Sequence, residues 1–536
     1  MDQLDSLPPF ANRNLMATEV ELKLAFPGNA LAAVEAHPLI AGSPREGNDE
    51  TLENTYFDTP TLELFAEKIA VRTRKAGKRW LQTVKCAATS VGGLSSRPEW
   101  EQPYRDQFDF AAVDAEKVRK FLESRQPRLL PLFSTVFHRQ TRRIEPRPGV
   151  VILLMLDVGK VVSAQGEAPI SELELELVSG APADLQDFAL SLAADLPLIP
   201  FDRSKAERGY RLFRKTPEKP AKAGKTPALP EMTPREAFRA IALQGQQIWQ
   251  ANLFGALNSD DPEYIHQFRV SLRKLNTLVR VFEPVIGDSF FGTWADQLKS
   301  LAASSGEARD LDVMRDEILQ PLLCSEGDAS HHQHVNHALA AVAAARSRAG
   351  EHFDRQRHGP PLLSFVRDLE HLPNPPAAPR IGDFSEARLA RLHRKAAKRL
   401  AKTVRKPTPE NAHHFRISLK HLRYTCEFFA PLFDEVPMTA FAREVATLQD
   451  EFGFINDLYV ALQRLDSWSA DDPALKDARD HIARWYGGRL DQSLATGLEA
   501  ASTVLGQCLP WCGECDRRQI EGIRKRIKQG ITVRID

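Results

Sequence analysis

The sequence contains no long apolar run. Its longest uninterrupted run of large apolar residues is Val150–Leu156, whereas a helix that spans a membrane needs about 20 apolar residues. We therefore predict no membrane segment. Residues 1–16 are polar and lack the apolar core of a signal peptide. They are predicted to form a disordered leader, with Met16 as an alternative start.

Cysteine is scarce, and the charges of the two signs cancel. Six cysteines in 536 residues do not form a disulfide framework, so we predict reduced thiols and a cytoplasmic location. Lys and Arg total 71, as do Asp and Glu, so the composition alone indicates no polyanionic partner. The positions of the charges are more informative than their sum.

The residue pattern changes along the chain, which is too long for a single hydrophobic core. Residues 17–213 contain short segments that alternate polar and apolar side chains, as strands do. Residues 214–234 are rich in proline and lysine and are predicted to be a linker. Residues 235–515 have a helical pattern, and residues 516–536 form a basic tail. We predict a multidomain α+β protein with an all-helical second half.

The helical half contains an internal repeat. The segment HQFRVSLRKL that begins at His266 recurs as HHFRISLKHL from His413, an offset of 147 residues (413 minus 266). The same offset aligns Gly306 with Gly453, and an aspartate follows four residues after each glycine. Because two separated blocks share one offset, we predict a duplicated helical unit.

Acidic residues alternate along two of the predicted strands. Glu19, Glu21 and Lys23 occupy alternate positions and should face one side of a sheet. A second strand places three carboxylates in the same way: Glu172, Glu174 and Glu176. Like charges so close cost energy unless a cation neutralises them, and Mg²⁺ or Mn²⁺ suits such oxygen ligands. For either strand alone, a solvated acidic face remains the alternative.

Basic residues lie on other predicted strands and after the last one. Arg72 and Arg74 alternate, and Lys85 follows on the next strand. Further cations come later: Arg139, Arg142, Arg143, Lys205 and Arg208. A closed sheet lined by carboxylates and these cations would bind a metal–polyphosphate chelate, since Arg and Lys bind phosphate oxygens. Phosphoryl transfer depends mainly on positioning and charge stabilisation, so it requires no Ser, Cys or His nucleophile.

This ordered set of motifs resembles the CYTH superfamily, the triphosphate tunnel metalloenzymes, over roughly residues 17–213. The first motif is the ExExK signature at Glu19–Lys23. The others follow in the family's order: Tyr56–Thr59, Arg72 with Arg74, Gln82–Lys85, Arg97–Glu99, Arg139, Leu156–Gly159, Glu172–Glu176 and Ser204–Tyr210. The resemblance implies an eight-stranded antiparallel tunnel.

The resemblance also implies the roles of individual residues. The metal ligands would be Glu19, Glu21, Asp157, Glu172 and Glu174, with the choice among the three acids at 172, 174 and 176 left open. The phosphate-binding residues would be Lys23, Arg72, Arg74, Lys85, Arg139, Lys205 and Arg208. Catalysis is assigned to Glu19, Glu21, Lys23 and Lys85. The expected reaction is hydrolysis of tripolyphosphate to pyrophosphate and orthophosphate with Mg²⁺ or Mn²⁺.

Helices of the second half are basic on one face. The basic and histidine residues of each repeat recur at helical spacing: His266, Arg269 and Arg273, then His413, Arg416, Lys420 and Arg423. Between Arg388 and Arg423 there are twelve Lys or Arg residues and one acid, Glu410. Solvated helix faces usually mix signs, so this ratio favours a polyanion groove.

These helices resemble the CHAD domain, the conserved histidine alpha-helical domain, over roughly residues 235–515. The resemblance implies binding of inorganic polyphosphate by His266, Arg269, Arg273, Lys274, Arg309, Arg391, Lys395, Lys398, His413, Arg416, Lys420 and Arg423. The second copy has Asn456 in place of Arg309. Asp310 and Asp457 are expected to orient the basic side chains. Nucleic acid is disfavoured, because Tyr424 is the only Tyr or Trp in the basic segments 266–275 and 388–424.

Two other functions remain open from the sequence. The chain could be a non-catalytic scaffold that binds polyphosphate, or its tunnel could act as a thiamine triphosphatase or adenylate cyclase. Association with polyphosphate granules in the cytoplasm is a further expectation. No feature of the sequence indicates an oligomeric state.

Overall fold

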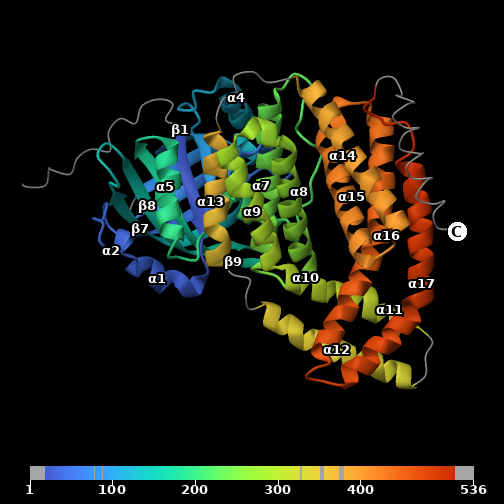
Figure 1. The fold of residues 1–536 in the computed structure, drawn as a ribbon. Helices are drawn as coiled ribbons and strands as arrows, with labels where there is room; N and C mark the ends of the chain where they lie inside the picture. Colours follow the sequence, from blue (N-terminus) through green and yellow to red (C-terminus); the bar gives the residue numbers. More distant parts are fainter. Residues whose placement is uncertain are drawn as a thin grey trace, which may run out of the picture. The chain divides into compact units, whose positions relative to one another are not determined.

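The computed structural model describes residues 18–77, 79–86, 89–325, 329–350, 355–372 and 380–512. Two compact units make up the chain. The first contains residues 1–219 and 354–367, and the second contains residues 220–353 and 368–536. Strands dominate the first unit and helices the second (Figure 1), which confirms the predicted α+β fold. The predicted leader and basic tail lie outside the described residues.

The sheet of the first unit closes on itself. Eight antiparallel strands follow one another in the order β1, β9, β8, β7, β2, β3, β4, β6, and β6 pairs back with β1. Their bounds are Thr18–Ala25 (β1), Glu50–Asp58 (β2), Ile69–Ala76 (β3), Arg79–Cys86 (β4), Leu94–Pro103 (β6), Leu130–Ile144 (β7), Val151–Ser163 (β8) and Gly166–Ser179 (β9). Two short strands, β5 (Thr89–Val91) and β10 (Ile199–Pro200), pair with β6 and β1. The closed ring is the predicted eight-stranded tunnel.

Alternation along the strands separates an apolar face from a polar one. Leu22 and Leu24 of β1 join the leucines of β8 and β9 in one buried cluster, together with residues of α5 (Pro182–Ala193). Glu21 and Lys23 occupy the intervening positions of β1 and face the other way. The burial of the leucines under α5 therefore fixes the register that turns the charged residues into the tunnel.

Short helices connect and cover the strands of the first unit. They are η1 (Gly28–Ala30), α1 (Leu31–Ala36), α2 (Pro38–Ala41), α3 (Glu63–Ala66), α4 (Glu116–Arg125), η2 (Gln126–Arg128) and α6 (Lys205–Phe213). Helix α6 begins with a capping box, in which Ser204 accepts from the backbone N–H of Glu207 and the Glu207 carboxylate accepts from that of Ser204. The cap fixes the first turn of α6, where Lys205 lies.

The second unit is built from helices. They are α7 (Pro234–Ala256), α8 (Pro262–Ile286), α9 (Asp288–Ser304), α10 (Gly306–Val313), a π-helical turn η3 (Met314–Leu319), α11 (Gln320–Leu323), α12 (Ala329–Gly350), α14 (Ile381–Arg405), α15 (Pro409–Phe429), η4 (Ala430–Leu432), α16 (Glu435–Trp468) and α17 (Ala474–Val504). Helix α13 (Arg355–Glu370) is divided between the units, and its Leu363 joins the apolar cluster of the first. Among the described residues, no helix is long and apolar enough to cross a membrane.

Helix positions in the second unit repeat with the offset found in the sequence. Helices α14, α15 and α16 begin 147 residues after α7, α8 and α9 (381 minus 234, 409 minus 262 and 435 minus 288). The long α16 thus corresponds to α9 and α10 together, which are separated at Ser305. The two copies therefore place their His and Arg residues on equivalent helices, α8 and α15.

Candidate active site and candidate polyanion site

Three carboxylates meet on one wall of the tunnel. Asp157 of β8 and Glu172 and Glu174 of β9 each contribute an oxygen, and these oxygens lie within 4.8 Å of one another. All three side chains are buried. The register places Asp157 beside Glu172 on adjacent strands, so the sheet itself brings them together. Hard oxygen donors gathered in this way fit Mg²⁺ or Mn²⁺.

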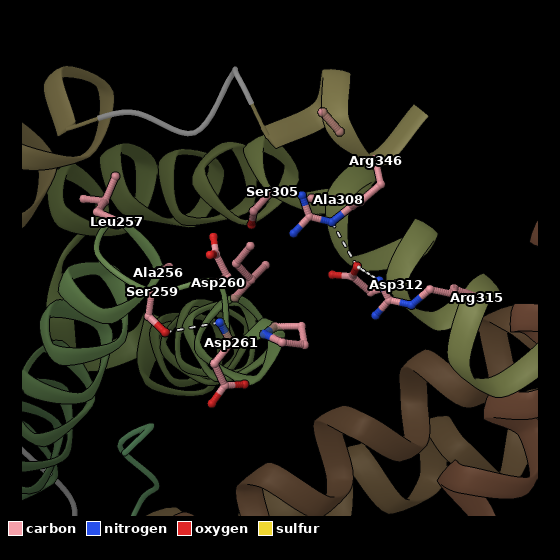
Figure 2. A pocket seen from close by; sticks show the side chains of 13 residues that line it. Ala256, Leu257, Ser259, Asp260, Asp261, Ser305, Ala308, Asp312, Arg315 and Arg346 are labelled. Atoms are coloured by element: carbon pink, nitrogen blue, oxygen red, sulfur yellow. Dashed lines mark hydrogen bonds and ion pairs between the residues drawn. The ribbon is translucent and has the colours of Figure 1, made fainter. Parts of the chain in front are cut away.

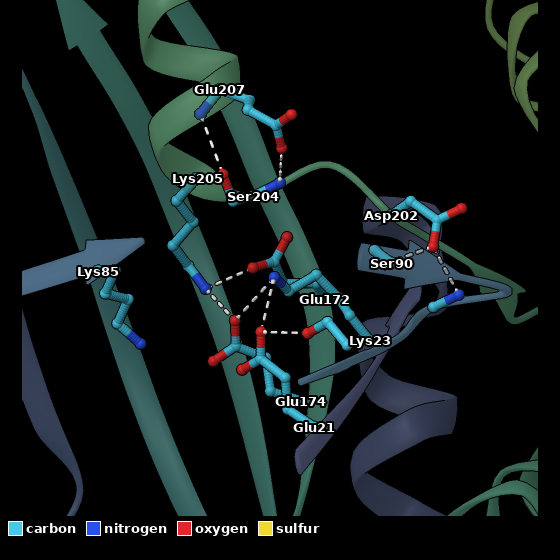
Figure 3. A network of polar contacts seen from close by, with 12 residues as sticks. Glu21, Lys23, Lys85, Ser90, Glu172, Glu174, Asp202, Ser204, Lys205 and Glu207 are labelled. Atoms are coloured by element: carbon cyan, nitrogen blue, oxygen red, sulfur yellow. Dashed lines mark hydrogen bonds and ion pairs between the residues drawn. The ribbon is translucent and has the colours of Figure 1, made fainter. Parts of the chain in front are cut away.

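An ammonium group from α6 contacts all three carboxylates, and Figure 3 shows it beside Glu172 and Glu174. Lys205 Nζ lies 2.7 Å from Asp157 Oδ2 and 3.0 Å from Glu174 Oε1, and it also donates to Glu172 Oε1. Burial alone would lower the pKa of Lys205, but the three carboxylates outweigh it and hold this pKa above its usual value. Lys205 therefore stays charged and balances part of the acidic cluster.

Two further cations pair with the same carboxylates. Arg139 Nη2 lies 2.5 Å from Asp157 Oδ2 and 2.6 Å from Glu174 Oε2. Lys23 Nζ lies 3.3 Å from Glu174 Oε1 and 3.8 Å from Glu21 Oε1. Burial would raise the pKa of Glu174, but Lys205, Lys23 and Arg139 hold it well below its usual value. The wall is thus a buried network of alternating charges, with all of its predicted cations in place.

The opposite wall carries three more of the predicted phosphate-binding residues, Arg72, Arg74 and Lys85. Lys85 Nζ lies 2.5 Å from Glu99 Oε2, and Arg74 Nη1 lies 3.7 Å from Glu101 Oε2. Burial, then the neighbouring Arg72, lowers the pKa of Arg74 to about 10. The Nε of Arg72 is buried and has no hydrogen-bond partner among the described residues. A buried donor without an acceptor is suited to an anionic ligand.

Some residues of this wall were not assigned a role from the sequence. Asn54 of β2 accepts from Arg74 Nε at 2.9 Å, and Thr135 receives a hydrogen bond from the Asn54 amide at 2.9 Å. Glu99 and Glu101 hold Lys85 and Arg74. Glu99 and Glu101 alternate along β6, so their position on the charged face of a strand could have been predicted from the sequence. The contact of Asn54 with Arg74 has no signature in the sequence, since it depends on the pairing of β2 with β3.

The remaining predicted tunnel residues lie around the acidic cluster. Arg208 Nη1 lies 3.1 Å from Glu172 Oε2, and burial lowers the pKa of Arg208. Glu21 is buried and accepts from Ser95 Oγ at 3.2 Å. Glu176 pairs in register with Glu21 but is only half-buried, unlike the two glutamates before it. The side chain of Glu19 lies outside the described residues, while its backbone pairs with Arg97.

In the helical unit, equivalent arginines pair with the predicted aspartates. Arg269 Nη2 of α8 lies 3.9 Å from Asp310 Oδ1. In the second copy, Arg416 Nη2 of α15 lies 3.7 Å from Asp457 Oδ2. The structure therefore brings each Arg–Asp pair together.

Cations of the two copies influence one another strongly. Burial, then Arg416 and Arg273, lowers the pKa of Lys420 to about 6. Burial, then Arg273, lowers the pKa of Arg269 to about 10. The Nε atoms of Arg269, Arg273 and Arg416 are buried and have no hydrogen-bond partner among the described residues. We call these residues, Arg269, Arg273, Arg416 and Lys420, the four-cation cluster. Its hydrogen-bond donors are therefore incompletely paired among the described residues.

Other predicted residues surround or lie apart from this cluster. Lys274 and Arg423 both bind Glu427, at 2.6 and 2.9 Å. Arg309 lies 3.4 Å from Glu317. Burial and, as the second-largest cause, the charge of Arg309 lower the pKa of His266 to about 4. In the second copy the equivalent Asn456 contacts His413 at 2.5 Å. Three predicted residues of α14 are exposed: Arg391, Lys395 and Lys398.

A separate pocket of about 530 Å³ lies beside α8, α10 and α12 (Figure 2). Asp312 binds Arg346 Nε at 2.9 Å at its edge, and Arg315 lies 3.6 Å from the same oxygen. The described residues that line it include none of the predicted polyphosphate-binding residues. This pocket is therefore not the predicted polyanion site.

Elsewhere in this unit, Cys508 is disulfide-bonded, so the expectation of reduced thiols is wrong at that position.

Comparison with known families assigns both halves of the chain. The family model of the CYTH domain matches residues 17–210, and that of the CHAD domain matches residues 240–466. The chain carries a CYTH domain followed by a CHAD domain. This confirms the resemblance stated for each half, while the boundaries predicted for the linker and the termini remain predictions.

Individual relatives match parts of the chain. An inorganic triphosphatase of Haemophilus influenzae is 33% identical over 203 residues, which are 38% of this chain and 57% of that protein. An uncharacterised protein of Mycobacterium tuberculosis is 24% identical over 291 residues, 51% of this chain and 54% of its own length. The chain thus spans little more than half the length of these relatives. The crystal structure of the CHAD domain from Ricinus communis is 26% identical, with a TM-score of 0.41, and covers 52% of this chain and 97% of that one.

Proposed function

We propose that the CYTH domain is a metal-dependent triphosphatase that hydrolyses tripolyphosphate to pyrophosphate and orthophosphate. The observation that carries the proposal is the buried cluster of Asp157, Glu172 and Glu174, surrounded by cations on both walls of a closed tunnel. The similarity of this region to an inorganic triphosphatase supports the same reaction.

In this proposal the acidic wall holds the metal and the cations hold the substrate. Asp157, Glu172 and Glu174 would hold Mg²⁺ or Mn²⁺, with Glu19 and Glu21 contributing from β1. The bound metal would neutralise phosphate charge and polarise the phosphoryl group under attack. The substrate would be gripped by Lys23, Arg72, Arg74, Lys85, Arg139, Lys205 and Arg208. Among these, Lys23 and Lys85 are assigned to stabilise charge at the reacting phosphate.

A carboxylate-to-amide substitution tests the metal site. Replacing Glu172 by Gln keeps the shape of the side chain but removes its charge. We expect tripolyphosphate turnover to fall by about 10²-fold or more, because each metal-site group contributes several kcal/mol to catalysis. Glu167→Gln is the matched control, since this exposed glutamate of β9 forms a surface ion pair with Lys160. Retained turnover in Glu172→Gln would exclude the assigned metal site.

We further propose that the CHAD domain binds inorganic polyphosphate through the four-cation cluster. The observation that carries this proposal is the meeting of four half-buried basic side chains from the two copies, three of which leave a buried Nε without a hydrogen-bond partner among the described residues. Phosphate oxygens would supply the missing acceptors. The other predicted binding residues would extend the contact along the helices. Cytoplasmic location and association with polyphosphate granules remain predictions.

Competition distinguishes polyphosphate from nucleic acid. In this experiment, labelled long-chain polyphosphate is bound to the full-length protein, and unlabelled polyphosphate or single-stranded RNA is added as competitor. The salt concentration is held fixed, because the binding of either polyanion depends on salt. We expect RNA to compete poorly, and Arg416→Ala to weaken polyphosphate binding about tenfold. The exposed Arg443 of α16, changed to Ala, is the control. Equal competition by RNA would favour a general polyanion surface instead.

A further inference from the structure

Two glycines of the CHAD domain lie against the guanidinium groups of the Arg–Asp pairs. A Cβ atom at Gly306 of α10 would lie 3.1 Å from Arg269 Nη1. A Cβ atom at Gly453 of α16 would lie 3.2 Å from Arg416 Nη2. The two glycines are equivalent positions of the duplication, separated by 147 residues (453 minus 306). The same close approach has therefore arisen or been kept in both copies.

The backbone does not require glycine at either position. Neither residue has the positive φ that disfavours other amino acids, and both belong to helices. Alanine is the better helix former. The reason for glycine must therefore be sought in the neighbouring side chain, which in both copies is an arginine.

The partners of each arginine explain why it approaches so closely. Arg269 Nη1 donates to the carbonyl oxygen of Ala302 at 2.6 Å, and its Nη2 faces Asp310 at 3.9 Å. The aspartate follows the glycine by four residues in both copies, which is about one helical turn. Glycine and aspartate thus share a helix face, and the guanidinium lies close to both residues. A methyl group at either glycine would crowd the guanidinium, which would have to shift by a few tenths of an ångström.

We propose that Gly306 and Gly453 are positioning residues that seat the guanidinium groups of Arg269 and Arg416 for polyphosphate. This inference rests on the proposed polyphosphate-binding function of the four-cation cluster. It assigns the glycines no contact with the ligand. Their role is to leave the space in which each arginine can bind its aspartate while it contributes to the cluster.

Other glycines in these helices show that the arrangement is specific. Gly245 and Gly255 lie against Leu275 and Tyr264, so they serve the packing of apolar side chains. Gly292 of α9 has no atom within 4 Å of its Cβ position. It is therefore the matched control, because alanine there changes helix propensity without touching a neighbour.

The test compares affinity and stability for three alanine variants of the full-length protein. Long-chain polyphosphate is titrated into Gly306→Ala, Gly453→Ala and Gly292→Ala, and Tm is measured without ligand. We expect the first two variants to bind about threefold to tenfold more weakly. Tm should be unchanged or raised by about 1–4 °C, since alanine favours the helix. Gly292→Ala should keep the affinity of the unmodified protein.

A double-mutant cycle shows whether Gly306 acts through Arg269. In Arg269→Lys the forked guanidinium is absent, so adding Gly306→Ala should cost no further affinity. If the two substitutions weaken binding independently, the proposal that Gly306 positions the Arg269 guanidinium is wrong. It is equally wrong if Gly306→Ala and Gly453→Ala bind as tightly as Gly292→Ala. Failure of the unmodified protein to bind polyphosphate would overturn the proposed function, and this inference with it.

Discussion

Lys205 is the residue on which the acidic wall of the tunnel depends most. Its ammonium contacts Asp157, Glu172 and Glu174 together, and its side chain is only 5% exposed. Three buried carboxylates repel one another, and an uncompensated buried charge is costly. The cation is therefore as important to the fold of this wall as it is to the proposed binding of substrate.

Removing this ammonium should destabilise the CYTH domain. Lys205→Met keeps the length of the side chain and removes its charge, so we expect a loss of about 3–5 kcal/mol in the absence of metal. Chemical denaturation followed by a CYTH-domain probe measures it. Lys160→Met is the control, because Lys160 forms an exposed pair with Glu167 and should cost less than about 1 kcal/mol. Equal effects of the two substitutions would contradict the account of the wall.

Lys420 gives a prediction about pH. Its pKa is lowered to about 6 by burial and by Arg416 and Arg273, whereas in the unfolded chain it lies near 10.5. The unfolded state therefore binds more protons between these values, and this group makes stability fall as pH decreases from 10.5 toward 6. Lys420→Met should raise Tm relative to the unmodified protein, by about 2–4 °C at pH 6, with little difference near pH 10. A difference that does not vary with pH would contradict the lowered pKa.

At the scale of elements, Asp58 joins three parts of the CYTH domain. This buried carboxylate at the end of β2 accepts from the backbone N–H groups of Leu64 and Phe65 in α3, each at 2.9 Å. It also accepts from the Tyr210 hydroxyl of α6 at 2.8 Å. The motif at Tyr56–Thr59 therefore has a structural role. It ties α6, the helix that carries Lys205, to the sheet.

Loss of the Tyr210 hydroxyl should loosen α6. Tyr210→Phe removes one hydrogen bond to a buried carboxylate, so we expect a cost of about 1–3 kcal/mol and reduced tripolyphosphate turnover. Tyr104→Phe, in the same domain, is the control, and its effect should stay within about 0.5 kcal/mol. Denaturation and turnover are measured on the same preparations. Unchanged stability in Tyr210→Phe would show that Asp58 does not need this hydroxyl.

The elements also show how far the sequence leads. Strands β1, β8 and β9 are predictable because their apolar and acidic residues alternate or form buried runs. Strand β6 is not, since it contains Pro98 and Pro103, which disfavour strands. The sequence resemblance places Lys205 among the phosphate-binding residues. Its contact with the metal-site carboxylates depends on where α6 lies against the closed sheet, which no local pattern specifies.

At the scale of the whole molecule, a net charge of zero hides two different proposed anion sites. In the CYTH domain, cations are paired with a buried acidic cluster, as suits a metal-bound substrate. In the CHAD domain, four cations gather with few acids. The sequence showed this contrast in the placement of charges. The meeting of cations from both copies in one cluster required the packing of α8 and α15.

The two sites should be separable by mutation. The double variant Arg269→Glu with Arg416→Glu should weaken polyphosphate binding by about 10²-fold and leave tripolyphosphate turnover within about twofold. Glu172→Gln should do the reverse. Initial rates at saturating substrate and polyphosphate titrations are measured on each variant. Loss of both properties in either variant, with the fold retained, would show that the domains share one function.

The central claim is that the tunnel hydrolyses tripolyphosphate with a divalent metal. The most direct measurement is orthophosphate release from tripolyphosphate, ATP and thiamine triphosphate, each with Mg²⁺, Mn²⁺ or EDTA. We predict release from tripolyphosphate well above that from the other two, with no release in EDTA. Faster turnover of ATP or thiamine triphosphate would contradict the proposed substrate. No release from any of the three would contradict the enzyme itself and favour a polyphosphate-binding scaffold.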